Sequence, residues 1–435
     1  MHLRSRFATC ALAALLATAV GACGDDDPFG PITGEPGEAT LTGDITGVRQ
    51  LSADTTYTIS GQLNVKSGGV LRIPAGTLLL GDAGVIRSFL LVEQGGQIFA
   101  EGTRDAPIVF TSSRPAGQRA RGDWGGVVIN GRSNCSFPAP CSGEGDTGEF
   151  GGSQPNDNSG VLRYVRIEYA GLEISADNEL NGLTLNGVGS GTTIEFVQSH
   201  FGDDDGIEWF GGTVNVKYAV VTGAADDSFD FSTGWQGKGQ FWIVQQDPTL
   251  GDRGFEVDGN ERDFNATPLT SPLVFNVTLV GKGSGSTNTS VSPAGMQLRR
   301  GYAGKIRNAI VLGFESGLDI DNAETVARCQ SGEMVVSNSI FFMNAAFLDP
   351  DSDTFEEACT AEPGWTGLQQ VDPQLVAPFN RTNPDFRPQA GSPALTGFAT
   401  PPSDGFFSPV SFIGAVAPSG TNSDWYLGWI TTATS

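Results

Sequence analysis

Histidine is almost absent from this chain, and its cysteines lack the spacing of a zinc site. The 435 residues include two histidines, His2 and His200, and no C-x-x-C sequence. These absences argue against structural zinc, against histidine-based metal catalysis and against a Ser-His-Asp hydrolase. His200 is therefore predicted to be a structural residue of a repeated coil rather than a general base.

Basic residues are also few. There are 25 lysines and arginines against 49 acidic residues, which gives a formal net charge of −24. This charge argues against nucleic acid and anionic membrane surfaces as partners, and it favours divalent cations or neutral and cationic glycans. Since only 17% of the residues are charged and 60 are glycine, the acidity does not indicate a disordered chain.

Long hydrophobic runs are confined to the start of the chain. FATCALAALLATAV follows Arg4 and Arg6, a pattern typical of a secretory signal and too short to span a bilayer as a helix. The sequence VGAC, which ends at Cys23, resembles the lipobox of bacterial lipoproteins. The resemblance implies cleavage before Cys23 and acylation of that cysteine. The alternative is ordinary signal cleavage beside an incidental cysteine.

We therefore expect residues 1–22 to be a lipoprotein signal peptide. Residues 23–39, which are rich in glycine, proline and acid, are expected to be a flexible tether. The expected partner is the membrane, reached through the lipid anchor. The expected location is the outer membrane of the cell envelope, on its periplasmic or its surface-exposed face. No sequence pattern indicates an oligomeric state.

Four further cysteines, Cys135, Cys141, Cys329 and Cys359, lie in the body of the chain. An even number in an exported chain favours two disulfides. We predict that Cys135 pairs with Cys141 and Cys329 with Cys359, because the members of each pair lie within one predicted loop.

The body of the chain is repetitive. IEFVQSHFGDDDGIEWFGG begins at Ile194, and the similar VKYAVVTGAADDSFDFSTG begins 22 residues later at Val216. A shorter pattern, glycine followed by alternating apolar residues, recurs as GVVING, GLTLNG, GIEWFG, GFEVDG and GLDIDN. Propeller blades need about 40 residues per repeat and sandwiches show no fixed period. Coils of about 22–26 residues therefore predict an all-β parallel β-helix, with little helix.

Several segments resemble a known family. GGVLRIPAGTLLLGD, DWGGVVING and LRYVRIEYAG are similar to right-handed parallel β-helix proteins of the pectin-lyase-like type, among them bacterial surface lipoproteins. FIGAVAPSGTNSDWYLGW resembles the closing segment of such lipoproteins. The resemblance implies the architecture but not one activity, because this superfamily includes lyases, hydrolases and non-catalytic binders.

One domain is predicted over residues 40–435. The segment 40–66 is expected to cap the first coil and 370–435 to close the last. Long loops are expected at 131–160, 260–272 and 322–367.

The repeats predict a column of acidic side chains. With the repeats in register, Ile207 and Trp209 face inward, while Glu208, Asp230 and Glu256 face outward on consecutive rungs about 4.8 Å apart. Two unit charges about 5 Å apart repel by roughly 3 kcal/mol at an effective dielectric of about 20. An exposed column tolerates this, whereas a shielded one needs a cation, a basic side chain or protons. Neither outward column contains a base at these three rungs. In the next outward column, Arg299 is expected to lie between Asp258 and Asp321 and to neutralise them.

Acidic residues also gather at the turn before each of two strands. Asp204, Asp205, Asp226 and Asp227 either cap these turns through their own backbone or supply the oxygen ligands that Ca²⁺ requires. We treat these four aspartates as a candidate calcium site, and Ca²⁺ is the one cofactor expected. The sequence has no EF-hand-like loop.

Catalysis is the alternative that the resemblance raises. Asp204, Asp205, Asp227 and Asp230 are candidates for the acid and for the activation of water, as in glycosidases of this fold. Arg299, with Arg300 beside it, is the candidate base of a lyase. The N-T-D, G-H-G and R-I-K sequences of polygalacturonases are absent, so the prediction leans away from an enzyme.

The predicted function is a lipid-anchored envelope protein that binds a glycan or another surface ligand, assisted by calcium. The candidate ligand-binding residues are Glu208, Phe210, Asp230, Trp235 and Glu256. Phe210 is expected to face outward and Trp235 to lie on an exposed turn, where aromatic rings suit the apolar faces of sugars. The alternatives are a polysaccharide lyase or glycoside hydrolase, and a structural or adhesive surface protein.

Overall fold

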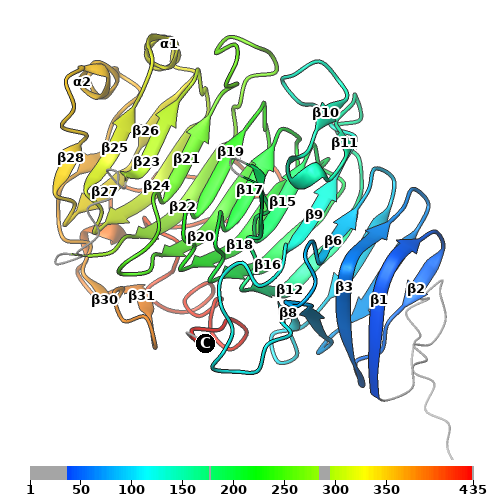
Figure 1. Ribbon diagram of the computed structural model, residues 1–435. Helices are drawn as coiled ribbons and strands as arrows, with labels where there is room; N and C mark the ends of the chain where they lie inside the picture. The colour runs from blue at the N-terminus through cyan, green and yellow to red at the C-terminus, as the bar shows by residue number, and fades with distance from the viewer. Residues whose placement is uncertain (1–36, 176–177, 284–293, 434–435) are drawn as a thin grey trace, which may run out of the picture.

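A computed structural model describes residues 37–175, 178–283 and 294–433, which wind into a parallel β-helix (Figure 1). Most strands belong to one continuous sheet of 25 strands, and every strand pair within it is parallel. The fold is all-β and consistent with the right-handed solenoid that the sequence predicts. Within the described ranges, no helix combines the length and the apolar character needed to cross a membrane.

Each central coil contributes one short strand and one long strand. The short strands form what we call the short-strand face. They are β6 (Phe89–Val92), β9 (Val127–Asn130), β15 (Leu183–Asn186), β17 (Ile207–Phe210), β19 (Phe229–Ser232), β21 (Phe255–Asp258), β23 (Ala294–Arg299), β25 (Ser316–Ile320) and β28 (Ala346–Leu348). The long strands are β12 (Gly160–Glu168), β16 (Thr193–His200), β18 (Asn215–Thr222), β20 (Lys238–Gln245), β22 (Leu273–Val280) and β24 (Lys305–Leu312).

The long strands bend in the middle, so each of them forms two faces of the solenoid. The bend is a single residue with positive φ that stacks rung upon rung: Tyr164, Phe196, Tyr218, Phe241, Asn276 and Asn308, with φ between 49° and 61°. Asparagine tolerates this conformation, whereas an aromatic residue rarely adopts it. The aromatic members compensate by stacking, with ring centroids 4.3 Å apart for Tyr164–Phe196 and for Phe196–Tyr218.

The first coils contain the segment 40–66, which was expected to be a cap. It forms strands of the main sheet, with β1 (Gly37–Ile45) paired in parallel to β3 (Thr55–Val65). The remaining strands of this end are β2 (Val48–Gln50), β4 (Val70–Pro74), β5 (Leu78–Gly81), β7 (Gln97–Glu101) and β8 (Ile108–Ser112). The segment is therefore the first part of the solenoid itself.

The last coils of the solenoid contain two short helices, where the sequence predicted only a loop. They are α1 (Ala323–Gln330) and α2 (Phe355–Thr360). Cys329 and Cys359 join them in the predicted disulfide, and both cysteines are buried in the main core. The last strands of the sheet, β26 (Val335–Ser337), β27 (Ser339–Phe342) and β29 (Leu368–Gln369), lie nearby in the chain.

The segment 370–435 does not close the last coil, contrary to the prediction. It contains the antiparallel pair β30 (Leu375–Ala377) and β31 (Asp385–Pro388), and then runs back along the outside of the long strands (Figure 1). Arg104, in an early coil, donates a hydrogen bond to the Leu427 carbonyl at 2.8 Å. The physical reason is the aromatic bend column, whose outward rings present apolar surface that Trp425 and Trp429 bury.

The interior is a stack of apolar side chains, and the predicted inward positions are confirmed. Ile207 and Trp209 are fully buried and pair in register with Phe229 and Phe231 on the next rung. Trp235 was predicted to be exposed, which is wrong. Its ring is completely buried and stacks on that of Trp209 with centroids 5.0 Å apart.

The neighbouring glycine explains the position of Trp235. Gly234 has a φ of +89°, and a side chain at this position would collide with the Pro268 carbonyl. This turn is followed by Trp235 inside the coil, where its indole N–H donates to the Val214 carbonyl at 3.1 Å.

Candidate functional site

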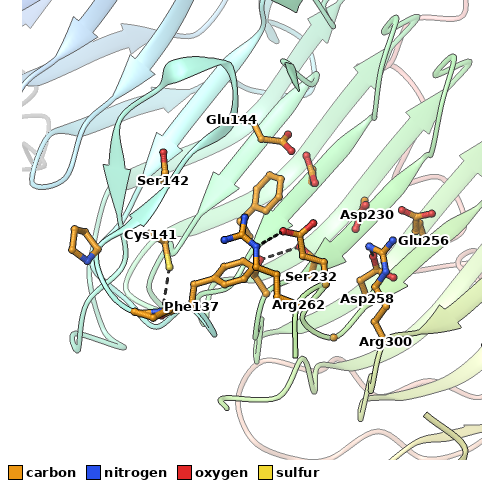
Figure 2. Close-up of a pocket in the computed structure, with 17 residues that line it drawn as sticks. Phe137, Cys141, Ser142, Glu144, Asp230, Ser232, Glu256, Asp258, Arg262 and Arg300 are labelled. Carbon is orange, nitrogen blue, oxygen red and sulfur yellow. Dashed lines mark hydrogen bonds and ion pairs between the residues drawn. The ribbon is translucent and has the colours of Figure 1, made fainter. Parts of the chain in front are cut away.

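A cavity of about 610 Å³ opens on the short-strand face, and we call it the acidic cleft (Figure 2). Strands β17, β19 and β21 form its floor. The loop at 131–160 and the segment after β21 form its walls. Its lining residues are Phe137, Pro138, Pro140, Cys141, Ser142, Glu144, Glu208, Phe210, Asp230, Ser232, Thr233, Glu256, Asp258, Gly259, Glu261, Arg262 and Arg300.

The predicted acidic column lies on the floor of this cleft. Glu208 is in register with Asp230, and Asp230 with Glu256, as the repeat predicts. The side chains point out of the coil, yet Glu208 is 6% exposed and Asp230 is 9% exposed. The column is thus shielded rather than open, because the loop 131–160 and the segment after β21 enclose it.

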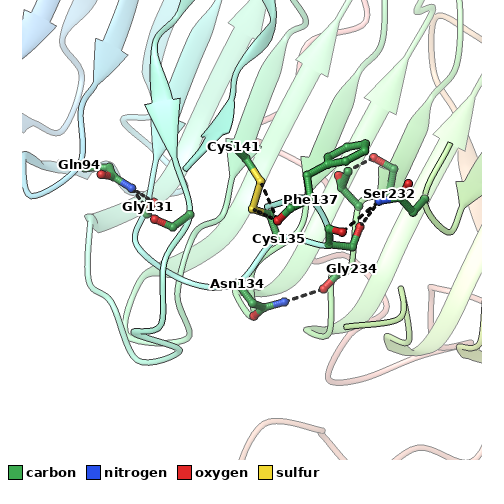
Figure 3. Close-up of a disulfide and its surroundings, with 12 residues drawn as sticks. Gln94, Gly131, Asn134, Cys135, Phe137, Cys141, Ser232 and Gly234 are labelled. Carbon is green, nitrogen blue, oxygen red and sulfur yellow. Dashed lines mark hydrogen bonds between the residues drawn. A yellow bond between two sulfur atoms is a disulfide. The ribbon is translucent and has the colours of Figure 1, made fainter. Parts of the chain in front are cut away.

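The loop wall is fixed by covalent and hydrogen bonds. The predicted disulfide Cys135–Cys141 is confirmed and contacts Phe137 (Figure 3). Gln94 donates to the Gly131 carbonyl at 2.9 Å, and Asn134 donates to the Gly234 carbonyl at 2.8 Å. The loop also contains β10 (Cys141–Ser142), the short helix η1 (Glu144–Asp146) and β11 (Glu149–Phe150).

Aromatic and basic side chains line the rim on the loop side. Phe137 and Phe210 are half-buried and belong to one small apolar cluster with the disulfide. The guanidinium of Arg262 lies over the Phe137 ring, 5.0 Å from its centroid, and is 3.1 Å from a carboxylate oxygen of Glu261. The outward position of Phe210 is as predicted.

One end of the floor is neutralised by arginines. Glu256 is 3.0 Å from Arg253 and 2.8 Å from Arg299. Asp258 forms ion pairs with Arg299 at 2.6 Å and with Arg300 at 2.5 Å. The sequence did not predict where the Arg253 side chain points. It extends from the turn before β21 toward Glu256 of the acidic column.

Arg299 had been expected to lie between two aspartates of its column, Asp258 and Asp321. It pairs with Asp258 as expected, but Asp321 instead accepts a hydrogen bond from Gln297 at 3.1 Å. Arg299 therefore neutralises the cleft rather than the far end of the column. This role leaves no free base there for the lyase chemistry considered above.

The other end of the floor has no such neutralisation. Glu208 accepts a hydrogen bond from the Asn181 amide, and no ion pair within the described part of the chain reaches Glu208 or Asp230. Burial, followed by the charges of Glu144 and Asp230, raises the pKa of Glu208 well above its usual range. Burial likewise raises the pKa of Glu144 to about 7, with the charge of Glu179 adding to it.

Asp230 is the least satisfied side chain of the cleft. Burial raises the pKa of its carboxyl well above the usual range, followed by the charges of Glu256 and Asp258. Its Oδ1 is buried and has no hydrogen-bond partner among the described residues. Buried polar atoms normally have a partner, so an unpartnered one in a cavity calls for an explanation.

The acidic turns lie beside the cleft and are partly structural. Asp205 accepts the backbone N–H of Asp227 at 2.9 Å, and Asp227 accepts that of Arg253 at 2.6 Å. One oxygen of each carboxylate therefore holds the turn of the next coil in place, whereas the turn-capping interpretation expected bonds within the residue's own turn. Asp204, Asp205 and Asp226 each also offer an oxygen within 4.8 Å of the others. Among the described residues, Asp205, Glu208 and Asp230 do the same.

The structure brings together most of the predicted ligand-binding residues. Glu208, Phe210, Asp230 and Glu256 line the cleft, and Trp235 does not. The lipidation candidate, Cys23, lies outside the described residues. His200 is a buried residue of β16 whose imidazole contacts the Thr222 hydroxyl and the Ala433 carbonyl, both at 2.6 Å.

Sequence reasoning missed Phe137, Glu144 and Arg262, which come from the walls, and the ion pairs of Arg253. Asp258 had been predicted in an outward column as a partner of Arg299. For Glu144, the available signal was its place in a long loop beside a predicted disulfide.

Comparison with known families agrees with this architecture. The family model described as a pectate-lyase-like β-helix domain matches residues 43–363. Searches of the curated proteins and of the solved structures returned no match. Since the matched region covers most of the chain, and the parallel coils of the structure extend across it, the chain belongs to the pectate-lyase-like β-helix family.

Proposed function

We propose that the acidic cleft binds a carbohydrate and that the protein is a binder rather than an enzyme. The observation that carries the proposal is the cleft itself: buried carboxyl groups on its floor and the phenyl rings of Phe137 and Phe210 at its rim. Its volume of about 610 Å³ falls in the range of about 300–1,000 Å³ typical of small-molecule sites.

The chemistry of the lining suits sugar rings. A protonated carboxyl donates a hydrogen bond and an ionised one accepts several, so Glu208 and Glu256 together serve both needs of a hydroxyl group. The faces of Phe137 and Phe210 suit the C–H groups of a pyranose ring. The disulfide wall is rigid, which limits the entropy lost when a ligand binds.

A polysaccharide hydrolase or lyase is the second candidate. Glu208, whose pKa is raised by burial and nearby charge, faces the cleft two rungs from Glu256, which forms ion pairs with Arg253 and Arg299. Carboxyls with such different environments are the usual pair of acid and base in hydrolases. The arginines are all engaged in ion pairs, which favours binding over lyase chemistry.

The experiment is a glycan array with the folded protein, followed by calorimetry on each ligand found. Glu208→Gln and Phe210→Ala are expected to weaken binding at least tenfold. Glu195→Gln, on β16 and outside the cleft, is the matched control and should bind normally. The absence of any bound glycan would refute the proposal. Release of products from a polysaccharide, lost in Glu208→Gln, would establish the enzyme instead.

We also propose that the acidic turns bind Ca²⁺ through Asp204, Asp205 and Asp226. Burial, and after it the charge of Asp226, raises the pKa of Asp204 to about 8. Such a group is stabilised by a cation or a proton. If calcium binds, Tm should rise with its concentration, and Asp204→Asn/Asp226→Asn should remove the rise. An unchanged Tm in the wild type would exclude the site.

The location proposed for this activity is the outer membrane of the cell envelope, with Cys23 as the lipid anchor. The support is the lipobox-like sequence that ends at Cys23. Metabolic labelling with an alkyne fatty acid should tag the wild type and not Cys23→Ser, and the variant should appear in the soluble envelope fraction. Membrane retention of an unlabelled Cys23→Ser protein would contradict the anchor.

A further inference from the structure

Carboxyl groups line the whole acidic cleft, but the arginines that pair with the floor carboxyls are confined to one end. Six carboxyl groups line the cleft: Glu144, Glu208, Asp230, Glu256, Asp258 and Glu261. The lining arginines, Arg262 and Arg300, are paired with Glu261 and Asp258. The negative charges at the Asp258 end of the floor are therefore paired with arginines, whereas those at the Glu208 end have no ion-pair partner among the described residues.

The uncompensated end has the shape of a receptor for a positive group. Glu208 and Asp230 lie on adjacent rungs of the floor. Glu144, on the loop, lines the same cavity as Asp230 (Figure 2). Asp230 is nine-tenths buried and lines the cavity, and in the described part of the chain its carboxyl has neither a hydrogen bond nor an ion pair. A donor supplied by a ligand would satisfy this carboxyl, and a positively charged donor would also stabilise the ionised forms of the three carboxyls, which burial and their mutual repulsion disfavour.

The same division of charge argues against an anionic ligand. A carboxylated sugar in this cleft would face six acidic side chains, and each lining arginine already has a carboxylate partner. The Arg262–Glu261 pair is exposed, but breaking the Arg300–Asp258 pair would leave the buried Asp258 with one ion-pair partner fewer. Polyuronates are thus disfavoured, although the fold family takes its name from enzymes that act on them.

We infer that the acidic cleft selects a glycan that carries a protonated amino group, and that the ammonium lies between Glu144, Glu208 and Asp230. This inference rests on the proposed carbohydrate function and deepens it. The ammonium offers three N–H donors, one for each carboxyl. The sugar ring would then extend toward Phe210 and Phe137 at the rim.

A metal ion is the main alternative occupant of the same floor. Asp205, Glu208 and Asp230 offer carboxylate oxygens within 4.8 Å of one another. The Asn181 amide, however, presents an N–H to Glu208, and an N–H donor is unsuited to a metal's coordination shell. A bare ion would also leave most of the cavity, about 610 Å³, unfilled.

The test compares three tetrasaccharide probes by calorimetry at pH 7 and moderate ionic strength, with a chelator present. The probes are a β-1,4-linked glucosamine tetramer, the same tetramer fully N-acetylated, and a galacturonate tetramer. We expect the aminated probe to bind at least tenfold more tightly than the acetylated one. The galacturonate probe should show no binding.

Variants distinguish binding in the cleft from a general electrostatic attraction of the amine to a chain of net charge −24. Asp230→Asn and Glu208→Gln should each remove most of the preference for the amine. Glu195→Gln removes one negative charge outside the cleft and should keep it. Melting curves check that each variant is folded, and both cleft variants are nearly isosteric with the native residue.

The outcomes are distinct. Equal affinity for the aminated and acetylated tetramers would overturn the inference and leave the carbohydrate function standing. An amine preference that survives in Asp230→Asn and Glu208→Gln would also overturn it, because the attraction would then be general. Binding of Ca²⁺ alone that is lost in Asp230→Asn, with no tetramer bound, would assign the floor to a metal. A glycan array with no ligand would instead refute the proposed function.

Discussion

At the scale of single residues, the cleft holds carboxyl groups that differ only in their surroundings. Asp258 and Asp230 both sit on the short-strand face and both are buried. Asp258 has two arginine partners, whereas Asp230 faces Asp205, Asp227, Glu208 and Glu256, with Arg299 the nearest influence of opposite sign. The first carboxyl is held in ion pairs, whereas burial and neighbouring like charges raise the pKa of the second.

The first prediction follows from the raised pKa of Asp230. A carboxyl whose pKa is higher in the folded state binds its proton more tightly there, so its contribution to stability is present at low pH. That contribution is lost as pH rises above the unfolded value of about 4 toward the folded one. Asp230→Asn should therefore be as stable as wild type near pH 4.5 and more stable by about 1–3 kcal/mol at pH 8. Urea unfolding at both pH values measures this.

The control is Asp258→Asn, which removes the same charge but leaves Arg299 and Arg300 without a partner. Its free energy of unfolding should fall at pH 8. If Asp230→Asn were instead the destabilised variant at pH 8, a cation bound to Asp230 would have to be part of the folded protein.

The sequence predicted the right column for these residues and left open whether it is exposed or shielded. The fixed coil length fixes which side chains stack, so Glu208, Asp230 and Glu256 were predicted in register. Their burial depends on residues from other parts of the chain, such as Phe137 and Glu144, which no local periodicity connects to them. The prediction of an exposed Trp235 was wrong for a related reason. The alternation of apolar residues ends at a turn, so it does not indicate which way Trp235 points.

At the scale of the element, the strands were predictable and the loops and helices were not. Several short strands, such as β9, β15, β17 and β21, have a glycine-led alternating pattern, which encodes both their existence and their inward face. The loop 131–160 takes its path from hydrogen bonds to distant segments, for example Asn134 to Gly234. Helices α1 and α2 have eight and six residues, which is too short for a helical period to emerge from the sequence.

The second prediction concerns β17, whose residues Trp209 and Phe210 point in opposite directions. Trp209 is fully buried against Trp235, Trp242 and Phe229. Trp209→Ala should lower the free energy of unfolding by about 3–5 kcal/mol through loss of burial and formation of a cavity. Phe210→Ala, which removes a half-buried ring at the cleft, should cost far less. Chemical denaturation of the two variants measures the difference.

This pair also separates stability from binding. Phe210→Ala should lose glycan affinity while keeping its fold, whereas Trp209→Ala should lose stability first. Similar losses of stability in both variants would mean that Phe210 belongs to the core and not to the binding site.

At the scale of the whole molecule, the C-terminal segment ties distant coils together. In a solenoid each coil contacts mainly its neighbours, so stability is close to a sum of local terms. Here the segment after residue 370 contacts coils from Arg104 to Asn308, for example through Gly414 and the Asn308 carbonyl at 2.8 Å. It also buries the aromatic bend column, which would otherwise be an exposed apolar strip of the kind that promotes association.

The last prediction tests this role of the C-terminal segment. Trp429 is fully buried and meets the rings of Tyr164 and Phe196 edge to face, with centroids 5.8 and 6.2 Å away. Trp429→Ala should lower the free energy of unfolding by about 3–5 kcal/mol. It should also increase the binding of a hydrophobic dye to the native protein, because the bend column loses its cover.

The matched control is Leu427→Ala, two residues earlier and 37% exposed, which should change neither quantity by much. Glycan binding should survive in Trp429→Ala at temperatures where it is folded, because the acidic cleft lies on the short-strand face and the segment covers the long strands. Loss of the cleft's affinity in a folded Trp429→Ala protein would show that the two faces are coupled through the coils. Trp209 of the short-strand face and Trp242 of β20 stack in the core with ring centroids 5.3 Å apart, so they are the first contact at which to look for such coupling.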